Sequence, residues 1–217
     1  MKRFFPVLNT RNAIVLILII LMIDQASKIY IKLHYPLSVY GQAAILDWGF
    51  FKILFIENKG MAWGTKFNDL LPFISEEVAK LLLTLFRIVA IGFLGFWLRG
   101  ILRSSSPYLL RLALCFIFAG AIGNLIDSIF YGLLFSHSYG QVAQFLPDEG
   151  YAGLFYGHVV DMLQFPLVSW VWPNWVPGIG GQSYTFFEYV FNVADSAISI
   201  GVGILLFFNK KIFGQKE

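Results

Sequence analysis

Residues 108–135 read YLLRLALCFIFAGAIGNLIDSIFYGLLF, an apolar stretch whose second half carries a few polar side chains. A bilayer-spanning helix needs about 20 mostly apolar residues, so this stretch predicts a membrane-spanning helix. At helical spacing its polar residues fall on one stripe. They are Asn124, Asp127, Ser128 and Tyr131. Polar groups at membrane depth are costly and face the protein interior, so the stretch also predicts polar contacts inside a bundle.

The composition of the whole chain agrees with a membrane protein. The 217 residues are 58% hydrophobic and only 13% charged, whereas a soluble domain averages about 25% charged residues. A single cysteine, Cys115, excludes a disulfide framework and a multi-cysteine metal site. We interpret Cys115 as a packing residue. The net charge of +3 is explained below by topology, so no nucleic-acid partner is predicted.

Four segments are long and apolar enough to span the bilayer. They are residues 13–33, 78–98, 108–135 and 185–208. The predicted fold is therefore an all-α bundle of four transmembrane helices. The connections are too short for a second domain, so residues 1–217 are predicted to form a single integral membrane domain.

The distribution of basic residues predicts the direction of these spans. Nine of the sixteen lie before the first span, around the connection of the second and third, and after the fourth, together with one acid, Glu217. By the positive-inside rule these segments are cytoplasmic, and so are both termini. The first span is not expected to be a cleaved signal peptide, because no A-x-A-like site follows its apolar core, 13–23.

Two segments are then predicted to lie outside the membrane, residues 35–77 and 136–184. The first contains a strand-like stretch, residues 45–56, and predicts a small extracytoplasmic β-sheet. Five of the six tryptophans fall on this outer side, and tryptophan is enriched in the headgroup layer. We therefore expect lipid contact by the second segment.

The other predicted spans also carry polar residues in their outer halves. The fourth has a stripe at positions i, i+4, i+7 and i+11, formed by Glu188, Asn192, Asp195 and Ser199. The first has Asp24 and Lys28 at i, i+4, and the second has Arg87. Together the stripes predict one polar pocket that opens outward. Small residues four apart in the third and fourth spans are compatible with close packing of these helices.

Asp161 and Asp195 are candidates for a reactive pair near this pocket. Two facing carboxyl groups in a low-dielectric site cannot both ionise. One can then take a proton from water while the other polarises a carbonyl group. The pattern alone leaves other roles open for intramembrane aspartates, namely structural hydrogen bonding, proton relay and ion binding.

Five motifs follow one another along the chain in the predicted outer halves of the spans and in the outer segments. They are DQASK (24–28), ENKGMAW (57–63), AGAIGNLIDS (119–128), GHVVDM (157–162) and FNVADS (191–196). In this order and placement they resemble the bacterial lipoprotein signal peptidases, the signal peptidase II family of aspartic proteases. The resemblance covers essentially the whole chain.

The resemblance implies a function and a set of site residues. Asp161 and Asp195 would be the catalytic aspartates. The residues implied to shape the site and hold the substrate backbone are Asn58, Gly60, Asn124, Asp127 and Asn192. Asp24 and Lys28 would serve stability.

The resemblance also implies the reaction and its setting. The substrate would be a prolipoprotein whose lipobox cysteine carries diacylglycerol, cut on the amino side of that cysteine. The enzyme would lie in the bacterial cytoplasmic membrane with its site on the outer face, as a monomer, with no metal or other cofactor. Membrane lipid would be its other partner.

The sequence departs from the family pattern in two ways. The family usually has Arg directly after the GNLID aspartate, and Ser128 stands there in this chain. We hypothesise that Arg87 supplies the missing cation; the alternative is a purely structural ion pair. The second departure is two long loops, residues 135–156 and 166–184, which could line an entrance, rest on lipid or meet a partner.

Two other classes of function can explain part of the pattern. A small carrier or proton-relay protein would use the same carboxylates, but such proteins show duplicated halves and broken helices, which this sequence does not show. A membrane scaffold would not explain buried aspartates flanked by asparagines. His158 is interpreted as a loop residue satisfied by hydrogen bonds, with tuning of Asp161 as the alternative.

Overall fold

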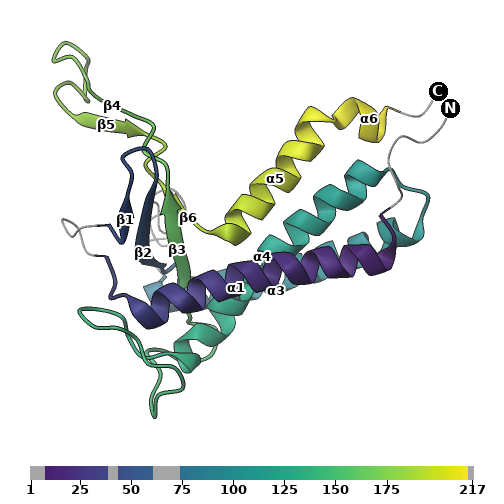
Figure 1. Cartoon of the computed structure of the whole chain (residues 1–217), viewed down its shortest axis with the longest axis horizontal. Coiled ribbons are helices and arrows are strands. Elements are labelled where there is room, and N and C mark those ends of the chain that lie inside the picture. The colour runs from purple at the N-terminus through teal and green to yellow at the C-terminus, as the bar shows by residue number, and fades with distance from the viewer. Residues whose placement is uncertain (1–7, 39–43, 61–73, 215–217) are drawn as a thin grey trace.

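The structure is a computed structural model that describes residues 8–38, 44–60 and 74–214. In these ranges three helices are long and apolar enough to cross a membrane: α1 (Thr10–His34), α3 (Glu76–Arg103) and α4 (Tyr108–Leu134). They run side by side, with a β-sheet at one end (Figure 1). We call this the sheet end of the bundle. The first three predicted spans are thus confirmed as long apolar helices.

The helix ends follow from local sequence. Asn9 caps α1 by accepting a hydrogen bond from the Asn12 backbone N–H at 2.8 Å. Ser75 caps α3 in the same way, and two acidic residues in its first turn suit the positive end of the helix dipole. α1 ends one residue before Tyr35, which precedes a proline and takes an extended backbone.

The fourth helix is shorter than predicted. α5 (Val193–Phe207) has 15 residues, a length of about 22 Å, and α6 (Asn209–Phe213) follows it after a break at Phe208. The predicted start at residue 185 is wrong, because residues 183–191 form strands and their connection. Glu188 therefore does not belong to a helical polar stripe.

The protein is not strictly all-α. Four antiparallel strands form one sheet in the order β1-β2-β3-β6. Their bounds are β1 (Leu46–Asp47), β2 (Lys52–Asn58), β3 (Val159–Gln164) and β6 (Val190–Phe191). The strand-like character of residues 45–56 is confirmed by β1 and β2. In the register of β2 and β3, Ile56 is paired with Asp161 and Asn58 with Val159.

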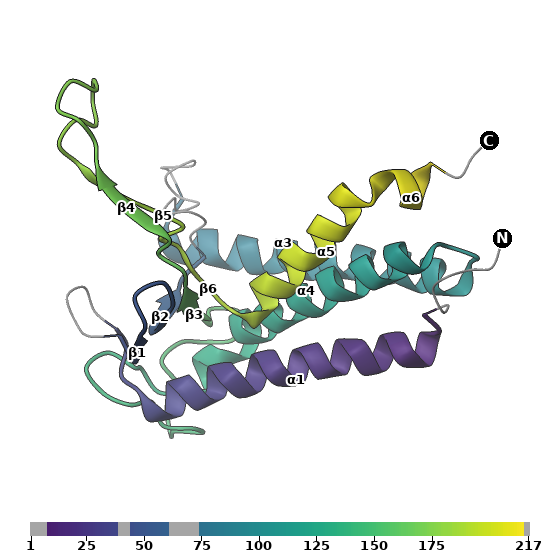
Figure 2. The same ribbon diagram turned by 45° about the horizontal axis from the view of Figure 1, so that its top comes forward.

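A separate two-stranded hairpin consists of β4 (Val168–Val171) and β5 (Ser183–Phe186). It projects from the sheet end, on the side of the bundle where α5 lies (Figures 1 and 2). The second long loop of the sequence is therefore largely an ordered hairpin.

α4 is the central helix of the bundle, in contact with α1, α3 and α5. Glycines on its α5 side allow close approach: a Cβ atom on Gly120 would lie 2.2 Å from the Ala194 carbonyl oxygen. A Cβ on Gly201 of α5 would lie 2.6 Å from the Ala113 carbonyl oxygen. Small residues thus lie at the contact between α4 and α5.

The first long loop returns along the end of α4. Residues 151–157, which we call the return segment, donate backbone hydrogen bonds to carbonyl groups of the last turns of α4 and to Phe135. Gly157 N–H, for example, donates to the Ser128 carbonyl oxygen at 3.0 Å. The return segment thereby satisfies exposed carbonyl groups at a helix end and leads directly into β3.

Candidate active site

Asp161 lies on β3 and is 4% exposed. Its Oδ1 accepts a hydrogen bond from Asn192 Nδ2 at 2.8 Å. Its Oδ2 accepts one from Asn58 Nδ2 at 3.2 Å. Both oxygens of this carboxyl group are therefore held by amide donors from different elements.

Asp195 lies in the first turn of α5 and forms a capping box with Asn192. The Asn192 side chain accepts from the Asp195 backbone N–H at 2.9 Å, and Asp195 Oδ2 accepts from the Asn192 backbone N–H at 3.3 Å. Asn124 Nδ2 of α4 donates to Asp195 Oδ1 at 2.7 Å. The motif FNVADS thus carries both the cap of the helix and one candidate catalytic residue.

Asn192 connects the two aspartates. Its Nδ2 donates to Asp161 Oδ1, lies 3.2 Å from the Val160 carbonyl oxygen and lies 3.1 Å from Asn124 Oδ1. Asn192 is fully buried, so these contacts are shielded from water. The arrangement fixes the start of α5 against β3 and α4, and with it the relative position of Asp161 and Asp195.

A buried ion cluster lies beneath these residues. Lys28 Nζ is 2.9 Å from Asp24 Oδ2 and 2.8 Å from Asp127 Oδ2, and all three side chains are fully buried. Lys28 also donates to Asn124 Oδ1 at 3.0 Å. Asp24 Oδ1 accepts from the Ala194 backbone N–H at 2.8 Å. α1 therefore supports the first turn of α5.

Asp127 is fully buried, and contacts from several elements hold it. Besides Lys28, its oxygens accept hydrogen bonds from Gln25 Nε2 at 3.0 Å and from the Val160 backbone N–H at 3.3 Å. The latter bond joins α4 to the strand that carries Asp161. These contacts suit a residue that positions β3.

Arg87 of α3 reaches the same region from the other side of α4. Its Nη1 donates to Ser128 Oγ at 2.9 Å, and Ser128 Oγ donates to the Asn124 carbonyl oxygen at 2.9 Å. The guanidinium also attracts Asp195, Asp127 and Asp161 electrostatically. The structure thus brings Arg87 next to Ser128.

Asn58 and Gly60 lie at the end of β2, beside Asp161. Asn58 Oδ1 accepts from the Gly60 backbone N–H at 2.8 Å. Gly60 has φ of +112°, and a Cβ there would lie 2.7 Å from Leu83 Cδ2, so this position requires glycine. The rest of the motif, residues 61–63, lies outside the described residues.

Burial and the charge of Asp195 raise the pKa of Asp161 to about 7. Hydrogen bonds from Asn58 and Asn192 act in the opposite direction. A carboxyl group in such surroundings keeps its proton at pH values well above its ordinary pKa. The site therefore combines Asp161, whose pKa is raised, with Asp195, whose charge contributes to that shift.

A second polar cluster on the other face of β2 is absent from the sequence predictions. Glu57 pairs with Lys32 and accepts from Ser138 Oγ at 2.8 Å, and its Oε2 lies 3.2 Å from His158 Nδ1. Burial acts to raise the pKa of Glu57, but the His158 hydrogen bond and the Lys32 charge lower it to about 2. His158 is thus held by hydrogen bonding, as interpreted from the sequence.

The members of this cluster come from four separate parts of the chain, which explains why the sequence did not predict it. The one local signal is a glutamate directly beside Asn58 in a strand-like stretch, where alternate residues face opposite sides. The cluster ties β2 to α1 and to the residue before β3. It therefore supports β2 and β3, the two strands that carry the site, from the face opposite the site.

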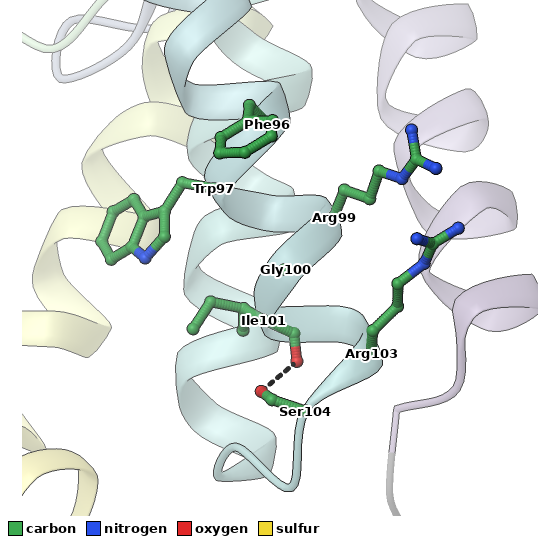
Figure 3. Close-up of a pocket in the computed structure, with 7 residues that line it drawn as sticks. All are labelled: Phe96, Trp97, Arg99, Gly100, Ile101, Arg103 and Ser104. Carbon is green, nitrogen blue, oxygen red and sulfur yellow. Dashed lines mark hydrogen bonds between the residues drawn. The ribbon is translucent and has the colours of Figure 1, made fainter.

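Two other features lie away from the aspartates. Cys115 is fully buried in an apolar cluster with residues such as Leu98 and Leu114, which suits a packing role. A shallow pocket lined by Trp97, Arg99 and Arg103 lies at the end of α3 away from the sheet (Figure 3). It shares no residue with the site.

Comparison with known proteins points to one family. Residues 16–210 match the sequence model of the family described as signal peptidase (SPase) II. A lipoprotein signal peptidase of Porphyromonas gingivalis is 46% identical over 194 residues, which cover 88% of this chain and 79% of that protein. One from Amoebophilus asiaticus is 34% identical over 87% of this chain and 73% of that protein.

Solved structures support the fold. A structure described as a bacterial membrane enzyme aligns with a TM-score of 0.56 at 19% identity, covering 96% of this chain and 93% of that chain. Another, described in the same words, aligns with a TM-score of 0.58 at 20% identity, covering 93% of this chain and 94% of that chain. At this identity the likeness concerns the fold alone.

Proposed function

The chain belongs to the signal peptidase II family of aspartic peptidases, and we propose that Asp161 and Asp195 are its catalytic pair. The protein is a bacterial multi-pass membrane enzyme that removes signal peptides from prolipoproteins. The observation that carries the proposal is the position of Asn192. Its side-chain amide donates to Asp161, while its own position caps the helix turn that holds Asp195.

In the proposed reaction the two carboxyl groups have different roles. Asp161 carries the proton, because burial and its neighbour favour the neutral form, and it donates a hydrogen bond to the scissile carbonyl oxygen. Asp195 acts as the base and takes a proton from a water molecule, whose oxygen then attacks the carbonyl carbon. As the water oxygen attacks, Asp161 passes its proton to the carbonyl oxygen. When the tetrahedral intermediate collapses, the C–N bond breaks, Asp195 gives the proton that it took from water to the leaving amine, and Asp161 takes its proton back as the new carboxyl group forms.

The amides around the pair fix its geometry. Asn124 and Asn192 hold Asp195 and Asp161 from the protein side, which leaves the opposite side of the carboxyl groups for substrate. Asn58 and Gly60, at the end of β2, are proposed to hold the peptide backbone. Asp127, Asp24 and Lys28 stabilise the underlying contact between α1, α4 and β3. Arg87 supplies positive charge in place of the arginine missing at Ser128.

We propose that the substrate carries a diacylglyceryl group on its lipobox cysteine and is cut on the amino side of that cysteine. The position of the candidate pair supports this. It lies where α5 begins, at the sheet end of helices that cross the membrane. A lipid-anchored peptide can reach this level by lateral diffusion. No metal or organic cofactor takes part in the proposed mechanism.

The proposed topology places the sheet end outside the cytoplasm. α1 begins and α6 ends at the opposite end of the bundle, near the connection between α3 and α4 (Figure 1). That end carries Arg99, Arg103 and Lys210 among other basic residues, which suits the cytoplasmic side. We propose that α5 and α6 together make the fourth crossing, and that a single domain acts as a monomer.

Cleavage of a diacylglyceryl-modified lipobox peptide tests the catalytic pair. Asp161→Asn and Asp195→Asn keep the shape of each side chain and remove its acid, so each is expected to lower kcat at least about 1000-fold. Asp47→Asn on β1, where the aspartate is exposed, is the matched control and should cut normally. Thermal melting in detergent verifies that each variant is folded. Normal cleavage by either folded site variant would contradict the proposal.

A further inference from the structure

The hairpin formed by β4 and β5 is the largest feature of the structure that the proposed reaction does not use. We define the aromatic hairpin as residues 165–187. Its strands pair antiparallel, with Val168 opposite Phe186 and Trp170 opposite Tyr184. It stands away from the helices in both views (Figures 1 and 2).

The two faces of the aromatic hairpin differ in polarity. Alternation along paired strands places Val168, Trp170, Tyr184 and Phe186 on one face. Trp170 and Tyr184 are in ring contact, with centroids 4.7 Å apart, yet Val168 and Phe186 remain 57% and 49% exposed. On the other face the hydroxyl groups of Ser169 and Thr185 lie 3.0 Å apart, between the exposed Leu167 and Val171. One face is thus formed by apolar and aromatic side chains throughout, and the other has a polar centre.

The apolar face needs a cover that the described helices do not provide. An isolated two-stranded hairpin is marginally stable in water, and here none of the described helices packs substantially against it. No charged residue occurs between Asp161 and Glu188. Such a segment has no charged side chain that could pair with a charged protein surface. Its transfer from water to lipid also costs little free energy.

The base of the aromatic hairpin leads into α5, which we propose to be part of the fourth membrane crossing. β5 is followed by Phe187 and Tyr189, which are 49% and 57% exposed, and then directly by β6 and α5. The exposed apolar surface therefore continues from the hairpin to a membrane helix. Tryptophan and tyrosine rings favour the depth of the lipid headgroups, where one end of the ring is in water.

We infer that the apolar face of the aromatic hairpin lies against the lipid leaflet at the sheet end, beside α5. Its polar face remains in contact with water. The hairpin is then a lateral extension that anchors the sheet to the leaflet from which the lipid-anchored substrate comes. This inference does not depend on the roles of Asp161 and Asp195.

Spin labels on neighbouring residues of opposite faces test the inference in the full-length protein in liposomes. Cys115→Ser removes the native thiol, and Val168→Cys or Ser169→Cys then adds one label site. Collision with oxygen, which dissolves in lipid, is compared with collision with a neutral water-soluble nickel chelate. We expect the label at 168 to collide mainly with oxygen and the label at 169 to collide mainly with the nickel chelate.

The label at 169 is the matched control, since it lies one residue away on the same strand. A label at 168 that meets the nickel chelate as freely as the label at 169 would overturn the inference. A label at 168 that meets neither reagent would indicate cover by another protein or a second copy, and would overturn it as well. Peptide cleavage by both labelled variants verifies that they are folded.

Discussion

At the scale of single residues, the surroundings of Asp161 make the stability of the protein depend on pH. Its pKa is raised from 3.8 to about 7. At low pH the carboxyl group is neutral in both the folded and the unfolded chain. As the pH rises, the unfolded chain ionises first, so the folded state loses relative stability until about pH 7.

We therefore predict that Asp161→Asn, which cannot ionise, weakens this dependence. Between about pH 4 and about pH 7, the free energy of unfolding of the wild type should fall more than that of the variant, by an amount on the order of 2 to 4 kcal/mol. The melting temperature of the wild type should fall more as well. Asp47→Asn is the control: Lys52 and the Gly49 backbone lower the pKa of Asp47, which is the opposite direction, so this variant should not weaken the fall. Equal slopes for wild type and Asp161→Asn would contradict the prediction.

Arg87 allows a second test at this scale. Arg87→Ala removes the charge near Asp195 and the hydrogen bond to Ser128. We expect kcat to fall about 100-fold, with Arg87→Lys in between because it keeps the charge but loses the planar donor group. Arg99→Ala, on the same helix at the far end, should cut normally. A folded Arg87→Ala variant with unchanged kcat would assign Arg87 a structural role.

The candidate site was predictable where polar residues recur along one helix or within a motif. Asn124 and Asp127 on α4, and Asn192 with Asp195, follow from such local patterns. The cluster of Lys32, Glu57 and His158 does not, because sheet register and the position of α1 bring its members together. Such long-range geometry leaves no periodic signal in a sequence.

At the scale of elements, the return segment fixes the distance between α4 and β3. A Cβ atom on Gly157 would lie 2.0 Å from the Asp127 carbonyl oxygen, whereas one on Gly153 would meet only a side-chain atom of Tyr156 at 3.8 Å. We predict that Gly157→Ala destabilises the protein by about 1 to 3 kcal/mol and lowers kcat, because β3 must shift. Melting temperatures and peptide cleavage measure both effects.

Gly153→Ala provides the comparison within the same segment and should behave like the wild type. If both variants melt and cut alike, the close approach at Gly157 does not control the position of β3. The sequence could not predict this contact, since glycine in a loop has no distinguishing pattern until its neighbours are known.

The limits of the fourth helix show how a hydropathy pattern can mislead. Residues 185–191 contain several apolar side chains, but 185–186 and 190–191 pair as strands. The decisive local signal is Asn192, a favoured N-cap residue whose third successor is the acidic Asp195. The capping box therefore indicates the start of α5, and the apolar content alone does not.

At the scale of the whole molecule, the arrangement predicts which surfaces a reagent on each side of the membrane can reach. In a Cys115→Ser background, a cysteine at Ser105, between α3 and α4, should react with an impermeant thiol reagent only after cells are permeabilised. A cysteine at Gln141, in the loop after α4, should react in intact spheroplasts. Both positions are exposed in the structure. The reverse pattern would contradict the proposed topology.

The contact between Asp24 and the Ala194 backbone joins the first membrane helix to the last one, 170 residues later in the chain. During synthesis, a nascent chain that has inserted only its earlier helices lacks the Asn192 cap, the α5 turn and Asp195. In the proposed mechanism such a chain cannot cut a peptide, because one member of the catalytic pair is not yet in place. Catalytic competence would thus arise only when the last helix has inserted.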